Sequence, residues 1–152
     1  MTDIRLADHP FFADLAPATI QAVGRCTAEV SFTPDEHPFQ ADEPADHFYV
    51  IERGRMAVEI DTPRQGPLVI STVGPGEILG VSWMLPPYRW TFDARAVEPT
   101  VALMIDAACL RDTCDEDPTI GYELYKRFAS LVHDRLVAAR LQMIDLYGNR
   151  AS

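Results

Sequence analysis

Aromatic and basic side chains are concentrated between residues 83 and 95, and their chemistry suits three different roles. Four rings lie within ten residues of one another in a chain that is only 9% aromatic: Trp83, Tyr88, Trp90 and Phe92. Buried together, such rings would add a large apolar area to a protein core. Exposed in a hollow, a ring can stack on a planar ligand while Arg89 or Arg95 pairs with an anionic group. On the surface, the same rings would form an apolar patch that docks another protein.

The histidines indicate neither a catalytic site nor a metal site. A metal enzyme of the cupin type needs two histidines one residue apart, then a glutamate, and a third histidine later in the chain. Here His47 and Glu52 are present without a second histidine beside His47, and the remaining histidines stand alone: His9, His37 and His133. No nucleophile-elbow motif is present either. We therefore expect a non-enzymatic protein with no catalytic residue and no bound metal.

Composition predicts one soluble cytoplasmic domain. A chain of 152 residues can bury a core without disulfides or metals. The cysteines are odd in number and match no zinc or iron–sulfur spacing, so we expect reduced thiols at Cys26, Cys109 and Cys114. Thirteen basic and 23 acidic residues give a net charge of −10, which disfavours direct contact with nucleic acid. The chain has no apolar run of the ~20 residues that span a membrane, and no signal peptide begins it.

Short alternating segments predict an antiparallel β-sandwich, roll or barrel in the first two thirds of the chain. A helix is expected to begin at Pro17, because proline suits a first helical position. After it, apolar and polar residues alternate with a period of two between turns rich in glycine and proline. Strands are expected from Ala28 and at Phe48–Ile51, Met56–Ile60, Leu68–Val73, Thr91–Val97 and Val101–Ile105.

The last third of the sequence predicts one long helix. Asp117 can cap its start, Pro118 falls in the first turn, and Gly148 is expected to stop it after about 30 residues. Apolar residues spaced alternately four and three apart form a coiled-coil seam: Tyr125, Ala129, Val132, Leu136, Ala139, Met143 and Leu146. A second apolar row covers only the first half of the helix: Leu124, Phe128 and Leu131. One roll is too short to cover the far end, which favours a homodimer over a monomer whose whole stripe packs on the roll.

This order of elements resembles the effector domain of the cyclic nucleotide-binding superfamily, the sensor half of catabolite activator and FNR-type regulators. Residues 41–58, ADEPADHFYVIERGRMAV, look like the family's acidic turn, strand, glycine turn and second strand. Residues 73–80, VGPGEILG, look like the approach to its phosphate-binding cassette. The resemblance implies an α+β fold that is mainly β: an antiparallel β-roll over residues 28–106, short N-terminal helices, and a dimerisation helix over 117–148. Together they form a single domain over residues 1–152.

By the same resemblance, any ligand would lie in the cassette, whose candidate residues are Leu79, Gly80, Val81, Ser82, Trp83, Tyr88, Arg89, Trp90 and Thr91. The family has a ribose-binding glutamate where this chain has Val81. The family's phosphate-binding arginine falls at Trp90, one residue from Arg89. Each hydrogen bond to a charged group contributes roughly 1.5–3 kcal/mol, so two lost bonds weaken binding roughly a hundred-fold to ten-thousand-fold. We expect weak or absent binding of cyclic AMP and no other cofactor.

The sequence therefore predicts a dimeric sensor or regulatory module in which the cassette is coupled to the long helix. The alternative is a ligand-free interaction module whose pocket is plugged by Trp83 and Trp90. In catabolite activators a DNA-binding domain follows the long helix, whereas only Gly148–Ser152 follow here. Any role in transcription is therefore expected to act through a protein partner.

Overall fold

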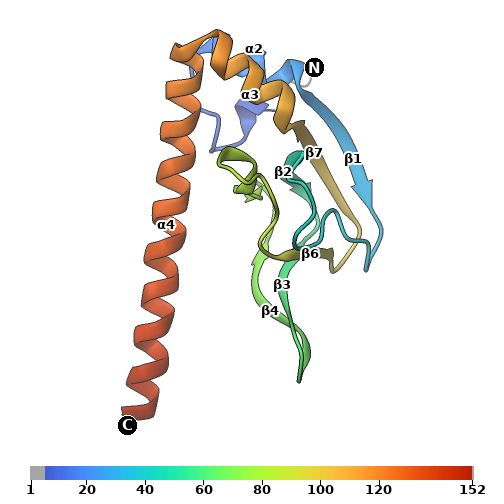
Figure 1. The fold of residues 1–152 in the computed structure, drawn as a ribbon, viewed down its shortest axis with the longest axis vertical. Coiled ribbons are helices and arrows are strands. Elements are labelled where there is room, and N and C mark those ends of the chain that lie inside the picture. The colour runs from blue at the N-terminus through green and yellow to red at the C-terminus, as the bar shows by residue number, and fades with distance from the viewer. Residues whose placement is uncertain (1–5, 152) are drawn as a thin grey trace.

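A computed structural model of the chain describes the backbone of residues 6–151 and the side chains of residues 6–146 (Figure 1). Its strands are β1 (Thr27–Phe32), β2 (His47–Arg53), β3 (Met56–Thr62), β4 (Gly66–Val73), β5 (Ile78–Leu79), β6 (Asp93–Ala96) and β7 (Thr100–Asp106). Its helices are α2 (Pro17–Arg25), the 3-10 helix η1 (Ser82–Met84), α3 (Ala107–Glu116) and α4 (Pro118–Ala151). Within the described residues the strands form two antiparallel sheets, ordered β1-β7-β2-β5 and β4-β3-β6. The predicted α+β fold with a β-roll and a long C-terminal helix is confirmed.

The turn between β2 and β3 depends on Gly54. This residue has a φ of +98°, which glycine adopts without strain. A Cβ atom at this position would lie 2.5 Å from the Pro99 carbonyl oxygen and 2.6 Å from the Thr100 Cα. Glycine is therefore needed both for the backbone conformation and for the close approach of the loop before β7.

Two predicted boundaries were wrong, and one helix was missed. The sixth strand begins at Asp93 rather than Thr91, and α4 continues beyond Gly148 to Ala151. Helix α3 was not predicted at all. Its apolar pattern consists of little more than Leu110 and Cys114, which lie four residues apart on one face. The Asp106 side chain caps α3 by accepting a hydrogen bond of 2.9 Å from the Cys109 N–H group.

Cys26 and Cys109 form a disulfide, so the prediction of three reduced thiols was wrong. Cys26 ends α2 and Cys109 lies in the first turn of α3, with their Cα atoms 5.8 Å apart. The two residues are 83 positions apart in the chain, and only the fold brings them together. Cys114 remains a free, buried thiol, whose pKa is raised by burial and, secondarily, by the neighbouring charge of Asp115.

Helix α4 has a covered half and an exposed half. In the first half, Leu124 and Phe128 are fully buried, and the Phe128 ring meets Phe48 of β2 edge to face at 5.2 Å between centroids. Beyond Leu131 every residue with a described side chain is exposed, and the C-terminal part of the helix runs beside the β3–β4 hairpin with a gap between them (Figure 1). The roll therefore covers about the first four turns of α4.

Candidate functional site

Trp90 fills the space beside Gly80, where β5 enters the cassette. Its side chain is only 5% exposed and stacks on Phe39, with ring centroids 3.7 Å apart and planes within 10°. Gly80 has a φ of +101°, and a Cβ atom built on it would lie 2.5 Å from Cη2 of the Trp90 ring. The indole therefore packs against the bare glycine backbone, so that no side chain and no ligand atom fits between them.

Backbone pairing with the loop before β2 fixes the direction of Trp90. The Trp90 N–H donates to the Glu43 carbonyl at 3.0 Å, and the Asp42 N–H donates to the Trp90 carbonyl at 2.8 Å. Neighbouring residues of an extended chain point to opposite sides. Arg89 accordingly faces outward: its side chain is exposed, and Nη1 donates to the Asp42 carbonyl at 2.6 Å.

Trp83 lies elsewhere, between the roll and α4, so the two tryptophans do not fill one common cavity. Its ring is fully buried, stacks on Phe48 at 4.8 Å, and meets Phe128 of α4 edge to face at 5.1 Å. Its indole Nε1 is the one buried side-chain polar atom without a hydrogen-bond partner among residues 6–146. Trp83 thus joins the cassette to the long helix.

Side chains from α3 and α4 also hold both ends of the cassette. Arg111 of α3 donates to the Trp83 carbonyl at 2.7 Å and lies 4.4 Å over the Tyr88 ring. The Tyr125 hydroxyl donates to the Met84 carbonyl at 3.4 Å, and burial raises the pKa of this tyrosine. Arg135 donates to the Ile78 carbonyl of β5; burial lowers its pKa, against an opposing effect of the Glu77 charge. Displacement of the cassette would therefore disturb contacts along the first half of α4.

The remaining predicted ligand residues do not form a charged site. Leu79 is buried opposite Tyr49, and the others of this group are partly or fully exposed: Val81, Ser82 and Thr91. Arg95 pairs with buried Glu59 at 2.9 Å and with Asp35 at 3.1 Å, which raises its pKa. Of the two arginines proposed to pair with an anion, one thus binds a backbone carbonyl and the other binds carboxylates.

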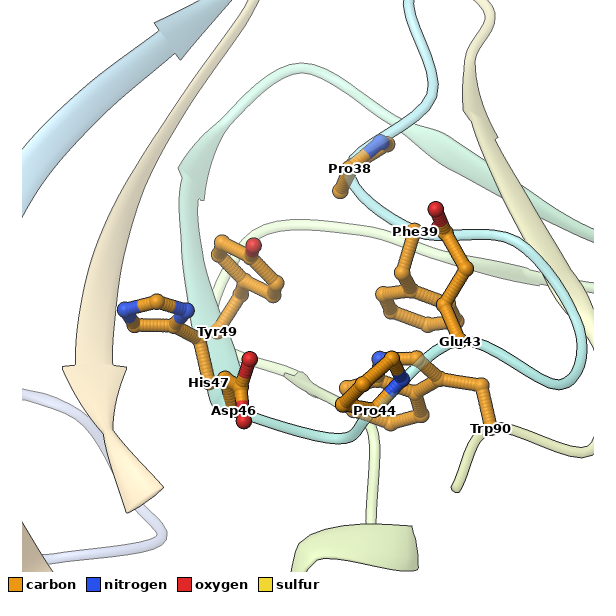
Figure 2. A pocket seen from close by; sticks show the side chains of 8 residues that line it. All are labelled: Pro38, Phe39, Glu43, Pro44, Asp46, His47, Tyr49 and Trp90. Atoms are coloured by element: carbon orange, nitrogen blue, oxygen red, sulfur yellow. The ribbon is translucent and has the colours of Figure 1, made fainter. Parts of the chain in front are cut away.

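A separate hollow of about 220 Å³ lies beside the Trp90–Phe39 stack (Figure 2). Its walls are Pro38, Phe39, Glu43, Pro44, Asp46, His47, Tyr49 and Trp90. Burial raises the pKa of Tyr49 to about 12. With two carboxylates and no lysine or arginine in its lining, this hollow disfavours a phosphate. The sequence analysis missed it, because residues 38–49 and Trp90 come together only through the backbone pairing described above.

The exposure of the seam residues differs between the covered and the exposed half of α4. Tyr125 is partly buried against the cassette, at a ring distance of 6.0 Å from Trp83. All the later seam residues are exposed: Ala129, Val132, Leu136, Ala139, Met143 and Leu146. Among the described residues no group of three or more acidic, histidine or cysteine side chains is arranged to hold a metal. The same part of the chain contains no helix that is long and apolar enough to cross a membrane.

Residues 29–117 match the family model of the cyclic nucleotide-binding domain, and the chain belongs to this family. A curated relative, the CRP-like cAMP-activated global transcriptional regulator of Mycobacterium tuberculosis, is 24% identical over 124 residues, which are 82% of this chain and 55% of that protein. The chain thus spans about half the length of this relative. Its relatives are regulators rather than enzymes.

Solved structures share the fold of this chain. A protein of Geobacter metallireducens assigned as cyclic nucleotide-binding has a TM-score of 0.80 and 27% identity, over 90% of this chain and 98% of that one. The catabolite activator protein of Thermus thermophilus has a TM-score of 0.70 and 20% identity, over 90% of this chain and 62% of that one. The second likeness concerns the fold alone.

Proposed function

We propose that this chain is a non-enzymatic, homodimeric regulatory module of the cyclic nucleotide-binding fold whose cassette is closed by its own side chains. The observation that carries the proposal is the packing of Trp90 on Phe39 and against Gly80. The family resemblance implies that the space beside this glycine would hold the sugar and phosphate of a nucleotide. In this chain a ligand can enter that space only after the indole leaves it.

Charge supports the same conclusion. Val81 offers no acceptor for a ribose hydroxyl, and Arg89 is directed outward to the Asp42 carbonyl. Absence of both interactions costs about 3–6 kcal/mol of binding free energy. Expulsion of a buried indole adds a further cost. We therefore propose that neither cyclic AMP nor another cofactor is bound.

A dimer is the second part of the proposal. Leu136 and Met143 expose 47% and 55% of their side-chain surface in one chain, and they lie on one line along α4. A second copy of α4 would bury this line in the manner of a coiled coil. The contacts of Trp83, Tyr125 and Arg135 would then transmit a change in the cassette to the dimer interface.

Calorimetry with cyclic AMP and cyclic GMP tests the closed cassette. The wild-type protein should show no binding at micromolar concentrations. Restoring the two missing groups, by Val81→Glu together with Trp90→Arg, should produce measurable binding, because the glutamate can accept from the ribose and the arginine can reach the phosphate. Val81→Gln with Trp90→Phe is the matched uncharged control and should not bind. Micromolar binding by the wild type would contradict the proposal.

The rival function is a sensor for a different ligand that displaces Trp90. The contacts between the cassette and α4 favour it, since they would couple such a ligand to the helix. A thermal-shift panel of nucleotides and planar anions distinguishes the two, because a ligand at 100 times its Kd stabilises the fold by about 2.7 kcal/mol. A ligand that stabilises the wild type would favour the sensor, and stabilisation by no member of the panel would favour the closed cassette.

A further inference from the structure

The Cys26–Cys109 disulfide borders a second hollow, of about 290 Å³, on the side of the molecule where α2 meets α3. Both cysteines line it, together with Arg25, Thr27, Ala28, His47, Met104 and Asp106. Cys26 is 7% exposed, whereas Cys109 is partly exposed. A small molecule in this hollow can therefore reach the disulfide, and it meets the Cys109 sulfur first.

The surroundings of the disulfide suit thiol–disulfide exchange. Arg25 places a positive charge in the hollow, which attracts an approaching thiolate. Cys109 occupies the first turn of α3, where the positive end of the helix dipole stabilises a thiolate. Asp106 acts in the opposite sense through its negative charge, although its Oδ1 accepts the Cys109 N–H at 2.9 Å.

We propose that Cys26–Cys109 is an exchange site for a low-molecular-weight thiol. The thiolate RS⁻ attacks Cys109 Sγ, a new R–S–Sγ bond forms, the Cys26–Cys109 bond breaks, and Cys26 leaves as a thiolate that takes up a proton. A second thiolate RS⁻ attacks the R sulfur, forms RSSR and releases the Cys109 thiolate. In sum, two RSH are oxidised to RSSR and the protein disulfide is reduced to two thiols. The reverse sequence, with RSSR as the oxidant, restores the disulfide.

Helix α3 connects this site to the regulatory parts of the molecule. Two residues beyond Cys109, Arg111 holds the Trp83 carbonyl and lies over Tyr88. One turn further on, Cys114 packs against Gly121 of α4, where an added Cβ would lie 3.1 Å from the Cys114 Cβ. Reduction frees the start of α3 from the end of α2, and the increased motion reaches the cassette and α4 through these contacts.

The test uses the whole folded chain in a series of reduced to oxidised glutathione ratios, followed by rapid alkylation and mass spectrometry. The expected result is a single two-electron transition of the Cys26–Cys109 pair, complete while the protein remains folded by circular dichroism. Hydrogen exchange of α3 and of residues 82–89 should rise at least several-fold on reduction. The buried Cys114 should stay unmodified in the folded protein, which makes it an internal control.

Two variants test which of the two cysteines forms the mixed disulfide with glutathione. In Cys26→Ser, oxidised glutathione should form a mixed disulfide at Cys109 at least ten-fold faster than it forms one at Cys26 in Cys109→Ser. Reduction of the wild type only at its global unfolding rate, equal rates in the two variants, or no disulfide under oxidising glutathione would each overturn the proposal. These outcomes are independent of nucleotide binding, so they leave the proposed function untouched.

Discussion

The cassette and the far half of α4 differ in how well one chain covers their apolar side chains. Trp83 and Trp90 are 0% and 5% exposed, and each is stacked on a phenylalanine of the roll. By contrast, Leu141 and Ile144 of α4 expose 57% and 63% of their surface. The cassette is therefore complete within one chain, whereas the helix presents apolar surface that a second molecule can bury.

This difference has a simple geometric origin. A helix of 34 residues is about 51 Å long at 1.5 Å per residue. The roll reaches only its first half, where Phe128 packs and Arg135 meets the Ile78 carbonyl. We infer that the proposed contact between two copies of this chain lies along α4. The cassette contributes to it by holding the first half of that helix in place.

The largest expected effect is on the dimer. Leu136→Glu together with Met143→Glu would place two charges from each chain inside the seam, so the dimer should dissociate at least a thousand-fold more readily. Light scattering or sedimentation should then give one mass of 17.0 kDa in place of twice that value. Folding should be retained, because both side chains are exposed in the single chain.

A matched control lies one residue further along at each position. Val137 and Ile144 are also exposed and apolar, yet they lie about 100° around the helix from the seam. Val137→Glu with Ile144→Glu should leave the dimer intact. Dissociation by the control pair alone would place the interface on another face of α4, and a monomeric wild type would remove the proposed dimer altogether.

The next effect is on the stability of the roll. Removal of a buried ring by Trp90→Ala should lower the free energy of unfolding by about 3–5 kcal/mol, as measured by urea denaturation. Phe92→Ala removes a neighbouring ring that is 36% exposed and should cost much less. A cost below about 1 kcal/mol at Trp90 would mean that the indole leaves its position easily and that the cassette is open to ligands.

The sequence predicted the regular parts of this fold and missed those that depend on contacts between distant residues. The period-two segments and the turn at Gly54 are local signals, and they located most of the strands. The coiled-coil spacing in the last third likewise predicted the long helix. The Cys26–Cys109 bond has no local signal, because two elements 83 positions apart must first pack together.

The cassette was predictable only in part. The sequence showed that Arg89 lies one residue from the family's arginine position but left open whether its side chain faces the pocket; in the structure Trp90 is buried and Arg89 binds the Asp42 carbonyl at the surface. The alternating rings gave no indication that Trp83 belongs to the helix contact and Trp90 to the roll. That separation depends on Phe39, Phe48 and Phe128, all of which are more than 30 residues from the tryptophan that they contact.

A smaller effect is expected on the stability of the roll at alkaline pH. The pKa of Tyr49 is raised by burial from 10.0 to about 12, so the folded state favours the neutral phenol. The associated stability is fully present below pH 10 and is lost as the pH rises from 10 to 12. It amounts to about 2–3 kcal/mol. Tyr49→Phe should flatten the fall in unfolding free energy over this range, whereas Tyr122→Phe, at a tyrosine that is 70% exposed, should not change it.

The smallest expected effect is that of Arg89→Ala. The Arg89 side chain is exposed, and its one hydrogen bond, to the Asp42 carbonyl, is replaced by water when the side chain is removed. Unfolding free energy should therefore change by less than about 0.5 kcal/mol. Arg135→Ala provides the contrast, because that guanidinium is partly buried against the Ile78 carbonyl and links α4 to β5. Arg135→Ala should therefore be the more destabilising change. The opposite order would mean that the hydrogen bond from Arg89 to the loop around Asp42 stabilises the fold more than the contact of Arg135 with β5 does.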